Sequence, residues 1–465
     1  MFKAAVLLAG ALGWVCCAQK AEQKIAEPFR TLIDESRGLP PEFAADGLIR
    51  LSSAKELSVA VRRQLLLDAS EIAAQCQYSF PKRNLPGYEV DTPDGYLAKA
   101  FDLNLDELSL KARAVTALAA IDPAEARRLF DRMQGMRLSP ASCGVRLTPD
   151  LTPLYKVGRL LSATAFNAKE KEAGDDIAFL TRLIYGAWTP AQVRFIPGLV
   201  GDSTWLDDDQ FPGVLGAVTA SLGRVDRDEI SFRVYFNELA NGVSRLADLC
   251  TVRRVSNLPL LTAYRGLLIQ QLSGERCDRL RSQTTSFYAS AFGKMAEALY
   301  PANATLAQLT EDDVTPSSMV KPPESEESYF RSEQSLLLLT EFRALREERK
   351  SPAFNEADWQ QHVAVYLSAL KSWNSTEESS ERTYLHEKSI LYKAVRELEL
   401  TAEVRRAVVR DNLAFLEESR FRNLGIEWYW HVKELLPALE QAGFTDEALK
   451  DPILALYGQL KAKGL

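Results

Sequence analysis

The chain has 465 residues, of which 46% are hydrophobic, so it can bury an ordinary core across two or three domains. Its formal net charge is -7, and its lysines and arginines are spread along the chain without a concentrated basic stretch, which argues against a nucleic-acid partner. After the first eighteen residues no stretch approaches about 18 consecutive apolar residues, so the mature chain is expected to have no transmembrane segment.

The N-terminus has the pattern of a secretory signal peptide. Lys3 supplies a positive charge, and residues 4–15 form an apolar run that is too short to span a bilayer as a helix. Small residues at 16–18 fit a cleavage site that would leave Gln19 as the new N-terminus. We therefore expect residues 1–18 to be removed and the mature protein to be periplasmic or secreted.

The two adjacent cysteines leave an alternative open. A lipoprotein signal would attach lipid to Cys16 or Cys17 and make the protein membrane-anchored. Trp14 and Val15 stand where that signal prefers small residues, which favours simple cleavage.

The remainder of the chain has helical periodicity almost throughout, and no run of period-2 alternation has strand length. Even the β-branched and aromatic stretch at 230–236 continues into a helical pattern without a turn. The helices expected before the polar segment span residues 57–76, 108–120, 124–133, 177–188, 190–199, 214–222, 230–250, 258–272 and 284–300.

Residues 310–328 are polar, acidic and proline-bearing, which predicts a linker or long loop rather than a part of a core. This segment separates a helical-hairpin region at 19–309 from a C-terminal helical region at 329–465. The helices expected in the latter span residues 332–348, 356–373, 380–400, 402–418, 428–442 and 446–463.

Four cysteines remain in the mature chain, and an even number in an oxidising compartment predicts two disulfides. Neighbouring helices in an array are also neighbours in sequence. This favours the pairs Cys76–Cys143 and Cys250–Cys277 among the three available pairings.

Two of the expected helices form a tight hairpin. These helices, at 108–120 and 124–133, are joined by a short connection at Asp122 and Pro123. Small residues suited to close helix pairing are Ala112, Ala117, Ala119 and Ala126. The hairpin resembles those of the tetratricopeptide class of helical repeats, but the family's Trp-Leu-Gly-Tyr spacing and its period of about 34 residues are absent. We expect an all-α fold of irregular stacked helical hairpins, an α-solenoid or α-α array, with a helical C-terminal region.

An acidic loop is the first candidate binding site. It contains Asp202, Trp205, Asp207, Asp208 and Asp209. Clustered carboxylates could bind Ca²⁺, but the spacing differs from that of a calcium loop, and acidic residues before a helix also favour its dipole. We favour capping and solubility for these aspartates, and expect a ligand here only if the loop faces a groove.

The densest aromatic cluster surrounds Trp428 and Trp430, the second candidate binding site. It could form a platform for a sugar or a peptide. Adjacent positions on a helix point in different directions, however, so the two rings cannot share one face, and we favour core packing for them.

Histidines are scarce and predict no metal site. His386 and Glu387 begin an HExxH motif, but Ile390 stands where its second histidine would be. All three histidines (the other two are His362 and His431) lie in expected helices and are interpreted as partly exposed. The sequence has no nucleotide-binding loop, dinucleotide fingerprint or GxSxG motif, so no cofactor is expected.

These observations favour an exported binding or scaffolding protein of the cell envelope. Its partner would be an envelope protein, a peptide or a glycan, because helical arrays present extended surfaces. The alternative is an α-helical hydrolase or lyase that acts on polysaccharide or peptidoglycan through Asp and Glu residues. No catalytic residue can be assigned from the sequence.

Overall fold

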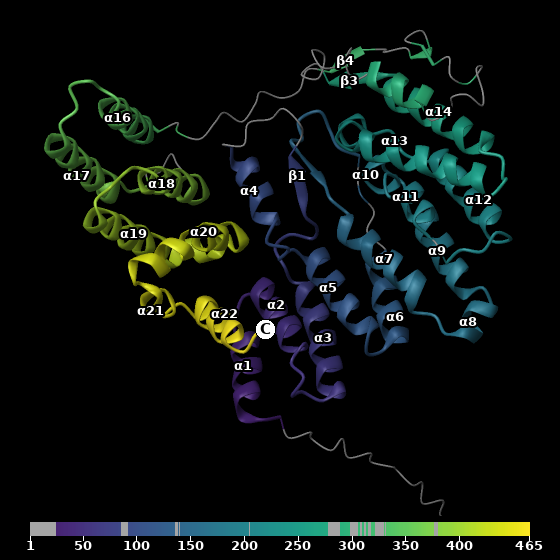
Figure 1. The fold of residues 1–465 in the computed structure, drawn as a ribbon, viewed down its shortest axis with the longest axis horizontal. Helices are drawn as coiled ribbons and strands as arrows, with labels where there is room; N and C mark the ends of the chain where they lie inside the picture. The colour runs from purple at the N-terminus through teal and green to yellow at the C-terminus, as the bar shows by residue number, and fades with distance from the viewer. Residues whose placement is uncertain are drawn as a thin grey trace, which may run out of the picture.

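The structure is a computed structural model that describes residues 25–84, 92–134, 138, 140–203, 205–277, 289–297, 306, 309–310, 313–314, 318–320, 330, 332–375 and 380–465. The expected signal peptide and most of the expected linker therefore lie outside the described residues. Most of the described residues are α-helical, which confirms the all-α class (Figure 1).

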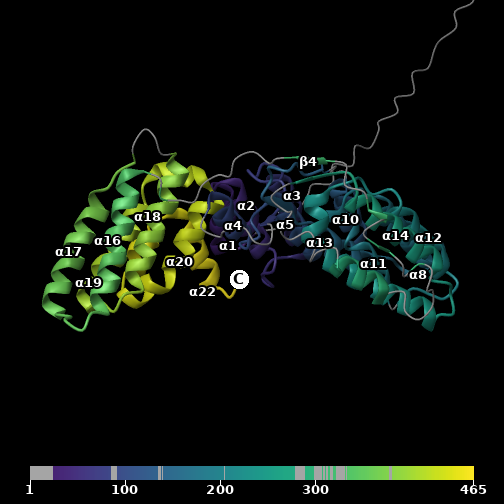
Figure 2. The same ribbon diagram turned by 90° about the horizontal axis from the view of Figure 1, so that it is seen from above.

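The helices before the expected linker form the N-terminal helix set, α1–α14. Their bounds are α1 Glu27–Arg37, α2 Pro41–Leu51, α3 Val59–Ala73, α4 Pro93–Phe101, α5 Glu107–Ala119, α6 Pro123–Met133, α7 Thr152–Thr164, α8 Ala168–Glu172, α9 Asp175–Tyr185, α10 Pro190–Val193, α11 Ile196–Gly201, α12 Phe211–Leu222, α13 Glu229–Val252 and α14 Leu258–Leu272. Each main helix packs on a near neighbour in the sequence, as in α2–α3, α3–α5, α5–α7 and α7–α9. Seen from above, the molecule is a broad arch (Figure 2).

Local sequence signals set these helix boundaries. Asp106 and Asp122 accept hydrogen bonds from the main-chain N–H groups of Ser109 and Glu125, at 2.9 and 3.1 Å, and so cap α5 and α6. The break expected at Asp122 and Pro123 is confirmed. The segment expected as one helix at 190–199 is divided into α10 and α11, because Pro197 stands in the first turn of a new helix.

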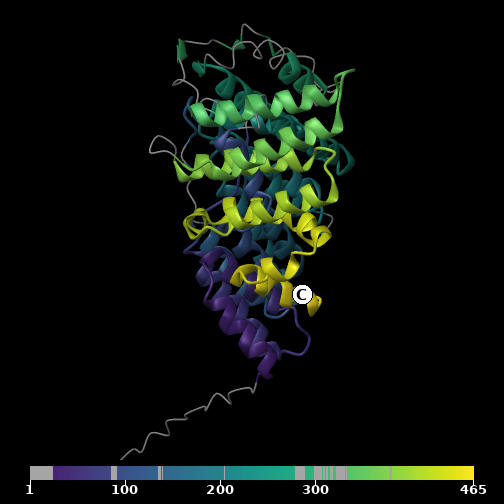
Figure 3. The same cartoon turned by 90° about the vertical axis from the view of Figure 1, so that its left-hand side faces the viewer.

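The C-terminal helix set, α16–α22, follows the expected linker (Figure 3). Its bounds are α16 Glu333–Arg349, α17 Glu356–Ser372, α18 Glu381–Arg396, α19 Ala402–Leu416, a 3-10 helix Ser419–Leu424, α20 Ile426–Ala442, α21 Thr445–Ala448 and α22 Pro452–Ala462. Helix α20 contacts α4, and α22 contacts α1 and α2, so the end of the chain packs against its beginning. Most of the buried apolar side chains of both sets belong to one continuous cluster.

Four three-residue strands accompany the helices in the described part of the chain. β1 (Lys82–Asn84) pairs antiparallel with β2 (Leu147–Pro149), with Lys82 opposite Pro149. β3 (Glu275–Cys277) pairs in parallel with β4 (Ser318–Val320), which lies inside the segment expected to be a linker. Such short strands carry too few residues to show an alternating pattern.

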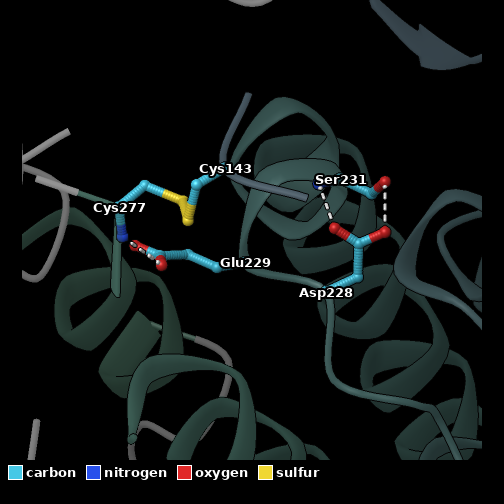
Figure 4. Close-up of a disulfide and its surroundings, with 5 residues drawn as sticks. All are labelled: Cys143, Asp228, Glu229, Ser231 and Cys277. Atoms are coloured by element: carbon cyan, nitrogen blue, oxygen red, sulfur yellow. Dashed lines mark hydrogen bonds between the residues drawn. A yellow bond between two sulfur atoms is a disulfide. The ribbon is translucent and has the colours of Figure 1, made fainter. Parts of the chain in front are cut away.

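One disulfide is present among the described residues, and it joins Cys143 to Cys277, with their Cα atoms 5.3 Å apart (Figure 4). Cys76 and Cys250 are free thiols, so both pairings favoured by the sequence are wrong. The first turn of α13 explains the observed pair, because it binds both partner segments. Asp228 accepts from the main-chain N–H of Ala141 at 2.9 Å, and Glu229 accepts from that of Cys277 at 3.1 Å.

Peptide mapping without reduction is expected to find one cross-linked peptide, which contains Cys143 and Cys277, with Cys76 and Cys250 alkylated. Cys277→Ser should lower the free energy of unfolding by about 2–4 kcal/mol, because it releases a long loop of the unfolded chain. A cross-link that contains Cys76 would contradict this arrangement.

Candidate functional site

A groove in two parts that share lining residues lies on the N-terminal helix set. The first part, about 910 Å³, lies between β1, α4, α5 and the start of α7. The second, about 710 Å³, lies between α7, α11 and α13. Thr152 and Lys156 line both parts, so the N-terminal end of α7 borders each of them.

The start of α7 is fixed by Asp150. Its Oδ1 accepts from the main-chain N–H of Thr152 at 3.0 Å and from the hydroxyl of Thr152 at 2.5 Å. The N–H of Asp150 donates to the carbonyl of Pro81 at 2.8 Å, just before β1. These bonds bring the side chains of β1 beside the first turn of α7.

The groove is cationic, although the whole chain is acidic. Its lining includes nine cationic side chains, from Arg50, Lys82, Arg83, Lys99, Arg113, Lys156, Arg159, Arg194 and Arg245. The acidic residues in the lining are Asp102, Asp150, Asp202 and Glu238. The absence of a basic stretch in the sequence was therefore a poor guide to the surface, because the fold gathers cations that are far apart in the chain.

Arg194 lies at the centre of this arrangement, with only 3% of its surface exposed. Its guanidinium donates to Asp150 Oδ1 at 2.6 Å, to the hydroxyl of Thr152 at 3.1 Å and to Glu238. It also lies over the ring of Phe195, 3.9 Å from the centroid. A buried cation needs such pairing to offset its loss of hydration, so Arg194 serves as a structural anchor for the groove.

Asp150 is held as a carboxylate. Burial alone would raise its pKa, but the hydrogen bonds from Thr152 and the charges of Arg194 and Arg83 lower the pKa below its ordinary value. Arg83 donates to its Oδ2 at 2.6 Å. A glycosidase needs one carboxyl group that is protonated near neutral pH, and Asp150 has the opposite shift.

Two lysines of the groove, Lys82 and Lys156, have no ion-pair partner among the described residues. Within the described part of the chain, no carboxylate lies within ion-pair distance of Lys82 or Lys156. Lys156 is exposed and Lys82 is half-buried, and both line the groove. Their charges are therefore free to attract an anionic group.

Only part of the expected acidic loop reaches this groove. Asp202 lines its second part and is paired with Arg159 at 3.2 Å and with Arg245 at 3.7 Å. Trp205 is half-buried against the core. The side chains of residues 207–209 are exposed just before α12, and Asp208 is 3.2 Å from Arg253.

The two tryptophans of α20 lie in different surroundings and outside the lining of the groove. Trp428 is buried, and its indole N–H donates to the carbonyl of Leu416 at 2.7 Å. Trp430 is half-buried, with its ring centroid 5.5 Å from that of Tyr96 on α4. Trp428 thus packs in the core, and Trp430 packs where the two helix sets meet.

The interpretation of all three histidines as partly exposed is wrong for His386 and His431. His386 is fully buried, and its Nδ1 lies 2.7 Å from Nε2 of His431. Its Nε2 lies 2.8 Å from Glu427, which also accepts from Arg382 at 2.7 Å. Only His362 is exposed, 3.0 Å from Glu348.

This histidine pair is located where the two helix sets meet. Tyr78, which follows α3, donates to Glu427 at 3.0 Å, and the ring of Tyr96 on α4 lies beside both imidazoles. A sequence signal was present: Arg382 precedes His386 by four residues, and Glu427 precedes His431 by four. Residues four apart share one face of a helix.

Burial lowers the pKa of both histidines. For His386 the carboxylate of Glu427 opposes this effect without cancelling it. For His431 the interactions with His386 and with the Lys393 ammonium add to the effect of burial, and the pKa lies well below its ordinary value.

No protein-family model matches the chain, and no curated protein matches it closely enough to indicate a relative. Among the helices described, none combines the length and the apolar character needed to cross a membrane. The site is therefore interpreted from its own geometry.

Stability is expected to fall as the pH drops below about 6.5, the ordinary histidine pKa. The unfolded chain binds a proton there that folded His431 does not, so the stabilisation is present above this pH and is lost below it. His431→Gln should reduce the slope of unfolding free energy against pH by up to about 1.4 kcal/mol per pH unit. Urea unfolding at several pH values measures this slope. The pH should range from about 5.5 to about 7.5, which is one unit on either side of the ordinary histidine pKa.

Equal slopes in the wild type and the His431→Gln variant would contradict the assignment to the buried pair.

Arg194→Ala is expected to lower the free energy of unfolding by about 2–3 kcal/mol, because it removes a buried guanidinium that joins Asp150 to Glu238, although Arg83 and Thr152 still bind Asp150. Arg159→Ala removes an exposed partner of Asp202 and should change it by less than about 0.5 kcal/mol. Denaturant unfolding of both variants measures the difference. Similar losses would show that Arg194 is not the anchor of the groove.

Proposed function

We propose that this protein is an exported binding protein of the cell envelope, and that it holds its partner in the cationic groove. The observation that carries the proposal is the groove itself, whose two parts share Thr152 and Lys156 in their lining and whose cations outnumber its acids. Binding sites are typically concave and carry a few polar groups that set specificity.

Two observations support export. The N-terminal pattern of Lys3, an apolar run and small residues is that of a signal peptide. The disulfide between Cys143 and Cys277 suits an oxidising compartment such as the periplasm or the extracellular space. The alternative is that the N-terminal signal is a lipoprotein signal and that Cys16 or Cys17 carries a lipid anchor.

Three of the four carboxylates in the lining are paired with arginines, and this pairing favours binding over hydrolysis. Asp150 and Glu238 both bind Arg194, and Asp202 is paired with Arg159 and Arg245. These acids are used to orient arginines. Surface cations without an ion-pair partner in the described part of the chain, such as Lys156, are suited to attract a partner.

Photo-crosslinking in the host cell tests this proposal. A benzoylphenylalanine residue in place of Lys156 should give cross-linked species in the extracytoplasmic fraction, because the groove is occupied there. The same residue in place of Lys433, which is exposed on α20 away from the groove, is the matched control and should give none.

The exported protein should begin at Gln19, which N-terminal sequencing checks. If Cys16 or Cys17 is found to carry lipid, the protein is anchored to the membrane rather than released, and the proposed binding role is unaffected. Cytoplasmic retention with residues 1–18 present, or identical cross-links at both positions, would contradict the proposal.

A further inference from the structure

We propose that the ligand of the groove is an extended acidic segment of a polypeptide. This inference rests on the proposed function, since it names the class of partner that the groove receives. It is argued from three features of the lining: its free cations, its covered aromatic rings and its amide side chains.

The first feature is the distribution of charge. Lys82 lines the first part of the groove, and Lys156 lines both, so the free cations occur along its course rather than at one point. Lys99, at the side of the first part, lies 4.2 Å from the ring centroid of Tyr96. Cations dispersed along a groove complement a chain with several carboxylates better than a single compact anion.

The second feature argues against a sugar chain. Sugar rings stack on open aromatic faces, whereas the aromatic residues of this lining are covered. Phe101 and Tyr155 are each 4% exposed. Phe195 is stacked on Tyr155, with ring centroids 4.6 Å apart, and the guanidinium of Arg194 covers it.

The third feature suits a main chain. Asn84 and Asn241 line the first and the second part of the groove, and each amide can both donate to and accept from a peptide unit. Small apolar surfaces between the cations, such as Ala98 and Pro153, can receive short side chains. Peptide recognition commonly combines main-chain hydrogen bonds with pockets for side chains.

The test uses the purified mature protein and a fluorescein-labelled octaglutamate peptide, followed by fluorescence anisotropy. We expect saturable binding that weakens as salt is added, since exposed charges are screened. Lys156→Glu and Lys82→Glu should each weaken binding about tenfold or more, because each puts a like charge in the path of the peptide. Both change side chains without ion-pair partners among the described residues, so circular dichroism should show an unchanged fold.

Lys433→Glu makes the same charge change outside the groove and should leave the affinity within about twofold of the wild type. An octaglutamine peptide should not bind. A labelled oligogalacturonate and a single-stranded oligonucleotide present the same charge on a sugar and on a phosphate backbone.

The outcomes separate the two proposals. One outcome is that oligogalacturonate or the oligonucleotide binds more tightly than octaglutamate, and that Lys156→Glu abolishes this binding. The groove is then a binding site, but the assignment of a peptide ligand is overturned. If no probe binds in a way that depends on Lys156 and Lys82, while cross-linking at Lys156 in cells also fails, the proposed function itself is overturned.

Discussion

The groove depends on one buried cation. Arg194 is almost fully removed from water, and a guanidinium in that position is stable only if most of its hydrogen-bond donors are paired. Asp150 and Glu238 pair its two terminal nitrogens, from the start of α7 and from α13, while the buried Nε–H has no hydrogen-bond partner in the described part of the chain. Asp150 also binds Arg83 of β1, so a single network fixes three elements that line the groove. The same network engages two of the four carboxylates in the lining, Asp150 and Glu238, which therefore do not pair with the lysines of the groove.

The sequence predicted most of the helices and the all-α class, because amphipathic periodicity and capping residues act locally. Asp122 and Pro123 mark a helix start in the sequence and in the structure alike. The groove could not be predicted in this way. Lys82, Lys156 and Arg194 are scattered along the chain and come together only through packing. The three-residue strands that align β1 beside α7 are too short for any periodicity to reveal them.

The disulfide shows the same limit. Proximity in sequence favoured pairs within neighbouring helices, but Cys143 and Cys277 are 134 residues apart. They meet because Asp228 and Glu229, in the first turn of α13, hold both segments by main-chain hydrogen bonds. The sequence held one weak indication of the histidine cluster. Arg382 and His386 are four residues apart, as are Glu427 and His431, so each of these two pairs lies on one face of its helix. Their burial, however, depends on the return of the C-terminal helix set to α4, which no local pattern encodes.

The central claim is that the cationic groove, and no other face, receives an acidic segment. Hydrogen–deuterium exchange of the mature protein with and without octaglutamate tests it most directly. The account predicts slower exchange at β1, in the second half of α4 and in the first two turns of α7, with α16–α19 unchanged. Protection confined to the C-terminal helix set, or none at saturating peptide, would contradict it.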